Sequence, residues 1–289
     1  MESNLDPGCC PRPGSPPPPE ATIEGAQWYR LLLVADPTYK APRPWRQLVA
    51  GLTFLYYGVG LAALAVWLLV REKLVGHDVF AAQRLVQRAY ASFIAVAAWL
   101  GSIRLTTRGA EALAGPGPRL VVANHPSLID SALVVRHLPQ ADSFVSPEWA
   151  TRPLFRTLVA AVEALPSDAG AAAVDAAVAR LRAGRSVVMF PEGTRSPAAG
   201  LGRFHRGAAH VALASGCDLL PVVIRIDPPT TRKGERWYDV PEKVPEVEVR
   251  VMPPLSPGKV LDGSESPMLA ARKVNAALRD IYEKVLDLG

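Results

Sequence analysis

The sequence predicts an α/β protein in which a mostly parallel sheet is flanked by helices, with an N-terminal membrane-embedded helical segment before it. Three observations predict this class. Beyond residue 104, short apolar stretches alternate with helical patterns, which is typical of parallel sheets because each parallel connection needs a crossover. A long run without any charge precedes them. The 289 residues are also 49% hydrophobic, which is ample for a sizeable core.

Composition divides the chain into three parts. Residues 1–25 contain the stretch PRPGSPPPPE and are predicted to be a disordered tail, because proline supplies no amide donor to a helix or a sheet. A PxxP ligand is the functional alternative for this stretch. Residues 26–103 are predicted to form a membrane-anchoring helical region, and residues 104–289 to form the α/β domain.

The longest apolar run is QLVAGLTFLYYGVGLAALAVWLLV, residues 47–70. A helix of this length, rising ~1.5 Å per residue, covers a hydrocarbon core of ~30 Å and is a transmembrane candidate. A signal peptide is the competing interpretation, but the run begins far from the N-terminus and is longer than the apolar part of such a peptide. A second uncharged run, residues 89–103, is too short for a comfortable span. It predicts a buried helix, a re-entrant hairpin partner or an interfacial helix. Basic residues flank the first run on both sides, so the positive-inside rule does not choose an orientation.

The hydrophobic periodicity of the α/β part predicts strands and helices that mostly alternate. The expected strands are residues 119–124, 143–146, 186–190, 219–226 and 247–251. The expected helices are residues 127–138, 152–165, 171–183, 207–215 and 267–286. Gly184 ends the third helix. The last strand alternates with period two, so we expect it to have one wet face and to lie nearer an edge.

Charge and cysteine content bound the partners. The net charge of +5 and the pI near 9.2 favour anionic partners. Because the basic residues are dispersed and accompany no nucleic-acid-binding motif, membrane phosphate groups fit better, and no nucleic-acid partner is predicted. The three cysteines, Cys9, Cys10 and the distant Cys217, form neither a disulfide framework nor a metal-binding pair, which indicates a reducing compartment. Four of the histidines show no ligand spacing, so no metal site is predicted.

The stretch VVANHPSLID, residues 121–130, ends the first expected strand in a polar cluster. Ser127 and Asp130 match a capping box, in which both side chains satisfy free amides of the first helical turn. That interpretation does not explain His125. If Pro126 turns the chain, the Asp130 carboxylate can accept from one imidazole nitrogen, fix the tautomer and stabilise the cation formed when the other nitrogen takes a proton.

Such a base would act without a protein nucleophile. No Gly-x-Ser-x-Gly elbow occurs in the chain, and Cys217 lies in an apolar context. A covalent acyl-enzyme is therefore poorly supported, and the proton would come from a hydroxyl of the substrate.

The second polar cluster is FPEGTRS, residues 190–196, which follows the expected strand SVVMF. Its residues lie in the loop at the carboxyl end of that strand, the usual location of ligands in open α/β sheets. Arg195 could engage a phosphate through paired donors, and Gly193 allows close backbone approach. The alternative is a surface turn, because Pro, Gly and Ser are turn residues in their own right.

Together, NHPSLID and FPEGTRS resemble the first and third motifs of the glycerolipid acyltransferase superfamily, which contains the bacterial 1-acyl-sn-glycerol-3-phosphate acyltransferases. The HxxxxD spacing is present from His125 to Asp130, and PEGTR is complete. RFHRGAAHVALASG looks like the family's F-K-x-G segment with His205 in the usual lysine position, and LLPVVI is similar to its fourth motif around Pro221. The resemblance covers roughly residues 100 to 230 and implies a glycerol-3-phosphate acyltransferase-like fold, with the acyltransferase catalytic domain at residues 104–289.

The resemblance implies an O-acyltransferase that moves an acyl chain from acyl-ACP or acyl-CoA directly to the hydroxyl of 1-acyl-sn-glycerol-3-phosphate, giving phosphatidate. It makes His125 the general base and Asp130 its orienting partner. The acceptor and phosphate contacts that it implies are Glu192, Gly193, Thr194 and Arg195. No cofactor is implied. The expected partners are the thioester donor, a lysophospholipid acceptor and membrane lipids, and the expected location is the inner or plasma membrane with the site facing the cytoplasm.

One departure concerns the acceptor. The family's second motif normally supplies an arginine in the segment corresponding to VEALPSD, residues 162–168, and none stands there. Either another cation, such as Arg203 or Arg206, substitutes for it, or the acceptor is a different lysolipid or a hydroxylated compound. From other classes, an inactive lipid-binding membrane module and a hydrolase that uses water as acceptor remain as alternatives.

Overall fold

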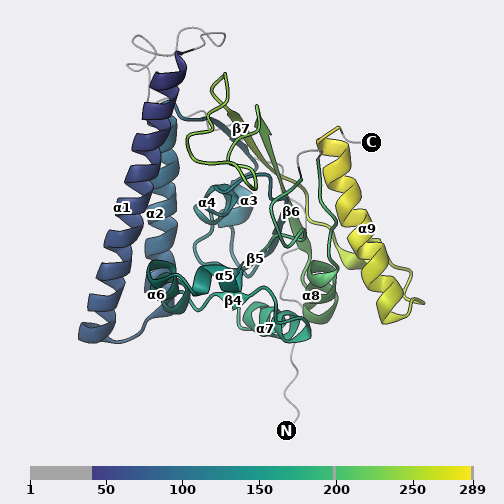
Figure 1. Ribbon diagram of the computed structural model, residues 1–289. Coiled ribbons are helices and arrows are strands. Elements are labelled where there is room, and N and C mark those ends of the chain that lie inside the picture. The colour runs from purple at the N-terminus through teal and green to yellow at the C-terminus, as the bar shows by residue number, and fades with distance from the viewer. Residues whose placement is uncertain (1–40, 198–199, 288–289) are drawn as a thin grey trace.

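The computed structural model describes residues 41–197 and 200–287, so the tail predicted for residues 1–25 lies outside the described residues. Seven strands form one sheet in the order β1-β7-β6-β2-β5-β3-β4. The strands are β1 (Arg104–Arg108), β2 (Leu120–Ala123), β3 (Asp142–Val145), β4 (Leu165–Pro166), β5 (Val187–Met189), β6 (Leu219–Asp227) and β7 (Glu246–Val251). Every neighbouring pair is parallel except β6 and β7. The predicted α/β class with a mostly parallel sheet is confirmed (Figure 1).

Helices cover both faces of this sheet. They are α1 (Arg43–Val75), α2 (Val79–Trp99), α3 (Glu111–Ala114), α4 (Asp130–Val135), α5 (Pro147–Ala150), α6 (Pro153–Ala161), α7 (Ala171–Arg182), α8 (Gly207–Ser215) and α9 (Pro267–Val285). One core cluster joins the sheet to α2 and α4, and a second joins it to α7, α8 and α9. The result is a three-layer arrangement with the sheet in the middle (Figure 1).

The central strand β2 shows why the sheet is buried on both sides. Val121 and Ala123 belong to the cluster with α2 and α4, whereas Leu120 and Val122 belong to the cluster on the opposite face. Successive side chains of a strand alternate between faces, so a strand with a helix layer on each side is apolar at every position. β2 pairs in parallel with both β5 and β6, which brings the carboxyl ends of these strands to one edge of the sheet.

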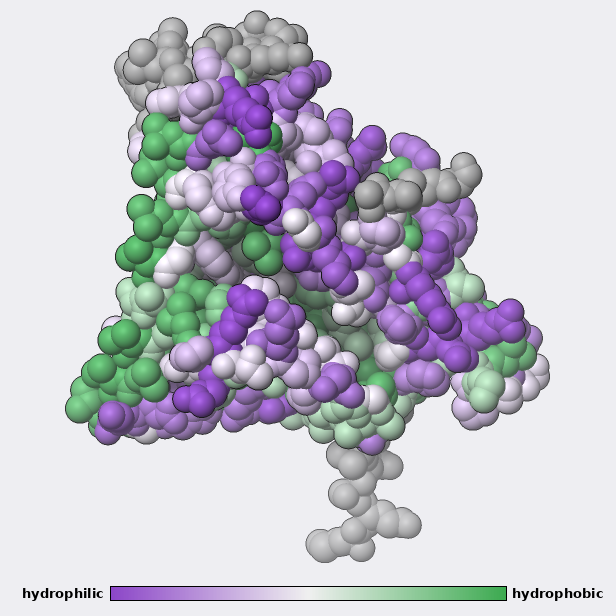
Figure 2. All heavy atoms as spheres, viewed as in Figure 1, coloured by the Kyte–Doolittle hydropathy of each residue, from purple (hydrophilic) through white to green (hydrophobic). Residues whose placement is uncertain are grey.

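Helix α1 presents a long apolar face to the outside. It is a 33-residue helix, long and apolar enough, by length and composition, to cross a membrane, as the sequence predicts. Its exposed large apolar side chains are Trp45, Leu48, Leu52, Leu55, Tyr56, Val59, Val66, Trp67, Leu69, Val70, Leu74 and Val75. Figure 2 shows hydrophobic residues along the edge that α1 forms.

Helix α2 returns beside α1 and completes a helical hairpin (Figure 1). Its Phe93, Ile94 and Ala97 are buried in the core cluster that includes α4. The second uncharged run is thus a hairpin partner with one face in the core. The helical hairpin and the sheet share this core, whereas the sequence predicts a domain boundary at residue 103.

A buried polar cluster ties the hairpin to the amino ends of two strands. Asp142, which is fully buried, accepts from Arg185 Nε (2.7 Å) and from Gln83 Nε2 of α2 (3.0 Å). The same Gln83 amide donates to the carbonyl of Val162 (3.0 Å). Because a buried carboxylate needs charged and hydrogen-bonding partners, these contacts fix how α2 sits against the sheet.

The helix expected over residues 152–165 is wrong in extent. Over this range the chain instead forms α6, which ends at Ala161, and then begins the short strand β4 at Leu165. Glu163 has a left-handed backbone with φ of +50°, which ends the helix and turns the chain. Leu165 then pairs with Phe144 of β3 and not with a further helical turn.

Two other boundaries also differ. The helix expected over residues 127–138 is confined to α4, because the residues before it are held in a loop by Asp130. Strand β1 (RLTTR) was not expected, since a five-residue stretch with a single apolar side chain carries no clear alternation. It pairs with β7 and forms an edge of the sheet, which leaves β7 one strand from that edge.

We expect His137, just after α4, to make the fold sensitive to acid. Within the described part of the chain its Nε2 is buried without a hydrogen-bond partner, and burial, aided by Arg136, lowers its pKa from 6.5 to about 4. The unfolded state then binds more protons, so stability falls as the pH drops from 6.5 to about 4, by roughly 2 kcal/mol for a ring that keeps some exposure. His137→Gln should flatten this part of the pH–stability curve measured by denaturation. A variant curve with the wild-type slope would contradict this.

Candidate active site

The loop after β2 leaves the sheet at Asn124. Its side chain donates from Nδ2 to the carbonyl of Ile224 (2.8 Å) and accepts at Oδ1 from the amide of Ile224 (2.7 Å). These two bonds satisfy the next rung of β6 with a side chain, so the backbone beyond Asn124 is free to turn. His125 therefore projects from the carboxyl end of β2, where ligands bind in open α/β sheets.

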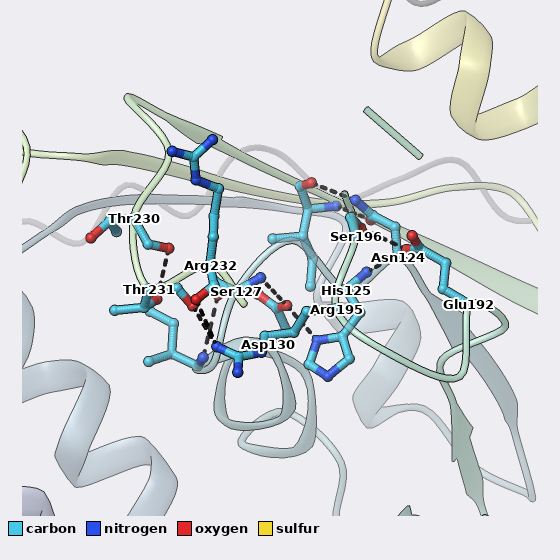
Figure 3. A network of polar contacts seen from close by, with 12 residues as sticks. Asn124, His125, Ser127, Asp130, Glu192, Arg195, Ser196, Thr230, Thr231 and Arg232 are labelled. Carbon is cyan, nitrogen blue, oxygen red and sulfur yellow. Dashed lines mark hydrogen bonds and ion pairs between the residues drawn. The ribbon is translucent and has the colours of Figure 1, made fainter. Parts of the chain in front are cut away.

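His125 and Asp130 are in direct contact, as the sequence predicts. The distance from His125 Nδ1 to Asp130 Oδ2 is 2.7 Å (Figure 3). Asp130 is fully buried, whereas the His125 side chain is 21% exposed. The ring of His125 also stacks on Phe190, which follows β5, with centroids 4.4 Å apart. The imidazole is thus held from two sides and reaches the surface.

The capping-box interpretation is only half correct. Ser127 N donates to Asp130 Oδ2 (2.6 Å), as in a capping box, but α4 begins at Asp130 and its N-cap, Ile129, makes no side-chain capping bond. The Ser127 hydroxyl instead donates to Asp130 Oδ1 (2.5 Å). Both oxygens of the carboxylate are therefore oriented by the loop, and one of them faces His125.

The hydrogen bonds of the pair assign its protons, because the Ser127 amide can only donate to Asp130 Oδ2, the oxygen that contacts His125. Complete burial raises the pKa of Asp130, and the hydrogen bonds from His125 and Ser127 oppose that rise by stabilising the carboxylate. A carboxylate accepts only, so His125 Nδ1 carries the proton toward it. The second ring nitrogen, Nε2, then holds a lone pair and points away from Asp130 (Figure 3). This geometry is that of a general base with an orienting carboxylate.

No protein nucleophile accompanies this base among the described residues near it. The hydroxyl of Ser127 is fully buried and is occupied by Asp130. Cys217 is buried in the core cluster on the opposite face of the sheet, with α8 and α9. The arrangement can activate a hydroxyl of a bound substrate, but it offers no side chain for a covalent intermediate.

Glu192 joins the two loops of the site. It is 4% exposed, and its Oε1 accepts from the amide of His125 (2.9 Å) and from the hydroxyl of Ser196 (2.7 Å). Its Oε2 accepts from the amide of Gly202 (2.6 Å). A further bond runs from the amide of Ser196 to the carbonyl of His125 (2.7 Å). The loop after β5 therefore forms hydrogen bonds with both the amide and the carbonyl of His125.

The other three residues implied by the PEGTR motif lie on the outer part of this loop. Gly193 has φ of +65°, the left-handed region that favours glycine. Thr194 is exposed, and its hydroxyl is 3.4 Å from Lys233 Nζ. Arg195 Nη1 donates to two backbone carbonyls, those of Thr231 and Arg232, at 3.0 Å each. All six site residues expected from the sequence thus come together on two adjacent loops and at the first residue of α4.

Sequence reasoning missed the contribution of residues far along the chain. Lys233 lies 39 residues beyond Thr194, in the connection from β6 to β7, and no motif marks it. The expected substitutes for the absent arginine, Arg203 and Arg206, are exposed before α8, and no ion pair involves either within the described residues. The role of Ser196 was signalled only by its place directly after PEGTR.

Comparison with known proteins shows that this chain is similar to acyltransferases. The family model described as Acyltransferase matches residues 104–225. The chain is 29% identical over 167 residues to the 1-acyl-sn-glycerol-3-phosphate acyltransferase alpha of Mus musculus, with 55% of this chain and 58% of that protein aligned. It is 29% identical over 194 residues to the Homo sapiens protein of the same name, with 65% of this chain and 66% of that protein aligned. For the 1-acyl-sn-glycerol-3-phosphate acyltransferase of Borreliella burgdorferi the identity is 26%, with 45% of this chain and 55% of that protein aligned.

The chain thus spans between 55% and 66% of the lengths of these three relatives. A solved structure, that of the 1-acyl-sn-glycerophosphate acyltransferase PlsC from Thermotoga maritima, shares the fold with a TM-score of 0.64. That match covers 84% of this chain and 98% of the other at 24% identity. Together, the family model, these relatives and the shared fold support the glycerolipid acyltransferase superfamily for this chain.

Proposed function

We propose that this chain is an O-acyltransferase that transfers an acyl group from acyl-ACP or acyl-CoA to the free hydroxyl of 1-acyl-sn-glycerol-3-phosphate, giving phosphatidate. The observation that carries the proposal is the contact of 2.7 Å between His125 Nδ1 and Asp130 Oδ2, which leaves Nε2 as a base at the surface. The relatives named above act on 1-acyl-sn-glycerol-3-phosphate by name, which supports the choice of acceptor.

The geometry supports direct transfer in a ternary complex. His125 Nε2 removes the proton of the acceptor hydroxyl, and the oxygen attacks the carbonyl carbon of the thioester. When the tetrahedral intermediate collapses, the carbon–sulfur bond breaks and the protonated imidazole returns the proton to the leaving thiolate. Asp130 stabilises the imidazolium while it exists. Ser127 is buried and its hydroxyl is bonded to Asp130, so it does not serve as a nucleophile and the proposal includes no acyl-enzyme.

Glu192 has a positioning role in this proposal. The motif implied an acceptor contact, but both of its oxygens are bound by protein donors, and a carboxylate would repel the acceptor phosphate. Its contribution is to hold the backbone of His125 against the loop that carries Thr194 and Arg195. We therefore assign contact with the acceptor to these two residues.

Helix α1 supports a membrane location, and its packing against the rest of the chain indicates whether it spans the bilayer or lies in one leaflet. Near its start, Gln47 Nε2 donates to the carbonyl of Tyr238 (3.3 Å), and near its end Leu68 packs in one cluster with Leu158 of α6. The α/β part therefore lies along the helix at both ends. A perpendicular span would carry this polar body into the hydrocarbon, so we propose that α1 buries its apolar face in a single leaflet. Proteolysis of sealed vesicles should then cleave the chain from one side only.

Acyl transfer by the purified full chain in phospholipid vesicles tests the function. A labelled acyl thioester would be supplied with lysophosphatidate, with other lysolipids, or with no acceptor. We expect labelled phosphatidate to form at a rate that saturates as the concentration of lysophosphatidate rises. Transfer only to another lysolipid would support the alternative acceptor, and free fatty acid without acceptor would support a hydrolase. Silence with every donor and acceptor would favour a lipid-binding module.

A further inference from the structure

The connection from β6 to β7, residues 228–245, contacts the loop that carries Thr194 and Arg195, and we call it the strap. Its first part is fixed by Arg195 to the loop after β5, residues 190–196, which we call the catalytic loop; Arg195 donates to the carbonyls of Thr231 and Arg232 (3.0 Å each). In Figure 3 the guanidinium of Arg195 lies between these strap residues and the His125–Asp130 pair. These two hydrogen bonds therefore fix the position of Thr231 and Arg232 relative to the loop that carries Arg195.

The second part of the strap is fixed to the anchor helix. The ring of Trp237 lies against Gly51 of α1, where an added Cβ would come within 3.2 Å of the ring. The carbonyl of Tyr238 accepts from Gln47, also on α1. The strap thus has one attachment at the catalytic loop and one at the helix that faces the membrane.

A tight turn stands between these attachments. Glu235 N donates to the carbonyl of Arg232 (3.1 Å), and Gly234 has φ of +89°, which favours glycine at the third position of such a turn. Glu235 also accepts from Arg232 through its amide (2.9 Å) and its Nε (2.6 Å). The remaining residue of the turn is Lys233, which is exposed and points to the Thr194 hydroxyl at 3.4 Å.

Of the two cations in this turn, Arg232 and Lys233, only Arg232 has a carboxylate partner among the described residues. The guanidinium of Arg232 is neutralised by Glu235, whereas no carboxylate in the described part of the chain forms an ion pair with Lys233. Arg195, next to Thr194, likewise has no carboxylate partner within the described ranges and uses one nitrogen on backbone carbonyls. Two cations without a carboxylate partner and one hydroxyl are therefore grouped where the strap meets the loop after β5; Lys233 and Thr194 are exposed there, and Arg195 is half-buried. This donor set suits a phosphate group.

We infer that Lys233, with Thr194 and Arg195, binds the phosphate of the acceptor and selects acceptors that carry a phosphomonoester. The inference rests on the proposed function and replaces the expectation that Arg203 or Arg206 supplies the cation. In lysophosphatidate the hydroxyl to be acylated and the phosphate ester are on adjacent carbons, so the phosphate must bind close to His125. The loop that carries Thr194 and Arg195 meets this requirement, because the amide of Ser196 donates to the carbonyl of His125 (2.7 Å). The strap's attachment to α1 keeps this cation at the side from which a membrane lipid arrives.

The same donors could take a phosphate of the thioester donor, so the experiment separates the two sources. Lys233→Ala is compared with wild type for the KM of lysophosphatidate, the KM of the acyl donor and the transfer to monoacylglycerol, which has the hydroxyl without the phosphate. Losing one charged hydrogen bond at an exposed site predicts a rise of about tenfold in the KM of lysophosphatidate, with kcat nearly unchanged. Transfer to monoacylglycerol and the KM of the donor should not change, and Lys233→Arg should recover most of the affinity.

Arg236→Ala is the matched control, because Arg236 is on the same strap but bonds to the Tyr238 hydroxyl and away from Thr194. An equal effect of both variants would mean that general surface charge causes it, and a rise only in the donor KM would mean that Lys233 binds a phosphate of the donor; either result overturns the inference.

A binding experiment tests the same inference without turnover: the equilibrium affinity for lysophosphatidate is measured on His125→Ala protein, with and without Lys233→Ala. If wild type fails to acylate lysophosphatidate, the proposed function fails, and the binding difference still decides on Lys233.

Discussion

His125→Ala should lower kcat for acyl transfer by about 10²- to 10⁴-fold, the usual contribution of a positioned general base. The imidazole is bonded to a buried carboxylate through one nitrogen, at 2.7 Å, and presents the other to the surface. Its removal leaves the acceptor hydroxyl with no base, because the carboxylates of Asp130 and Glu192 are buried and already accept from protein donors. Initial rates at saturating lysophosphatidate and donor give the comparison.

Asp130→Asn should lower kcat for acyl transfer by a similar factor, for a different reason. An amide in place of the carboxylate can donate to Nδ1 and so favour the wrong tautomer, with the proton on Nε2. His210→Ala is the matched control, because His210 is exposed on α8 and is not bonded to a carboxylate in the described structure. Since the His125 side chain is partly exposed, its truncation should leave the melting temperature close to that of wild type. A fully active His125→Ala enzyme would refute direct general-base catalysis.

The parts of the fold that could be predicted from sequence are those in which one physical signal dominates. β2 and β5 are short apolar runs between two helix layers, and the five expected strands are all present with ends within one residue of the prediction. β1 and β4 were missed because their pairing comes from neighbouring strands. β4 has two residues, and its Leu165 is placed by the left-handed turn at Glu163, which no local pattern marks.

The candidate site shows the same division. His125 and Asp130 are close in sequence, so a proline turn was enough to predict their contact. The link from Glu192 to the His125 amide spans 67 residues, and the link from Lys233 to Thr194 spans 39. Contacts of this kind depend on which strands become neighbours in the sheet. The motif could indicate that Glu192 matters, but only the fold shows which atoms it holds.

Glu192→Ala should lower both kcat and stability. The carboxylate satisfies three donors, the amides of His125 and Gly202 and the hydroxyl of Ser196. Truncation leaves buried donors unpaired, which costs on the order of 3 kcal/mol of folding free energy. It also releases the backbone of His125, and misplacement of a catalytic group by about 1 Å can cost on the order of 10²-fold in rate. Thermal melts and initial rates of the same preparation measure the two effects.

Ser196→Ala and Gly202→Ala sharpen this test. Ser196→Ala removes one donor of three and should cost no more than about 1.5 kcal/mol. Gly202→Ala adds a Cβ that would stand 2.7 Å from Glu192 Oε2, so the carboxylate must shift although no donor is lost. If Glu192 positions His125, Gly202→Ala should lower kcat in the direction of Glu192→Ala. If Glu192 instead contacts the acceptor, Glu192→Ala should raise the KM of lysophosphatidate at an unchanged melting temperature. The split between kcat and KM therefore decides which role the carboxylate of the PEGTR loop has.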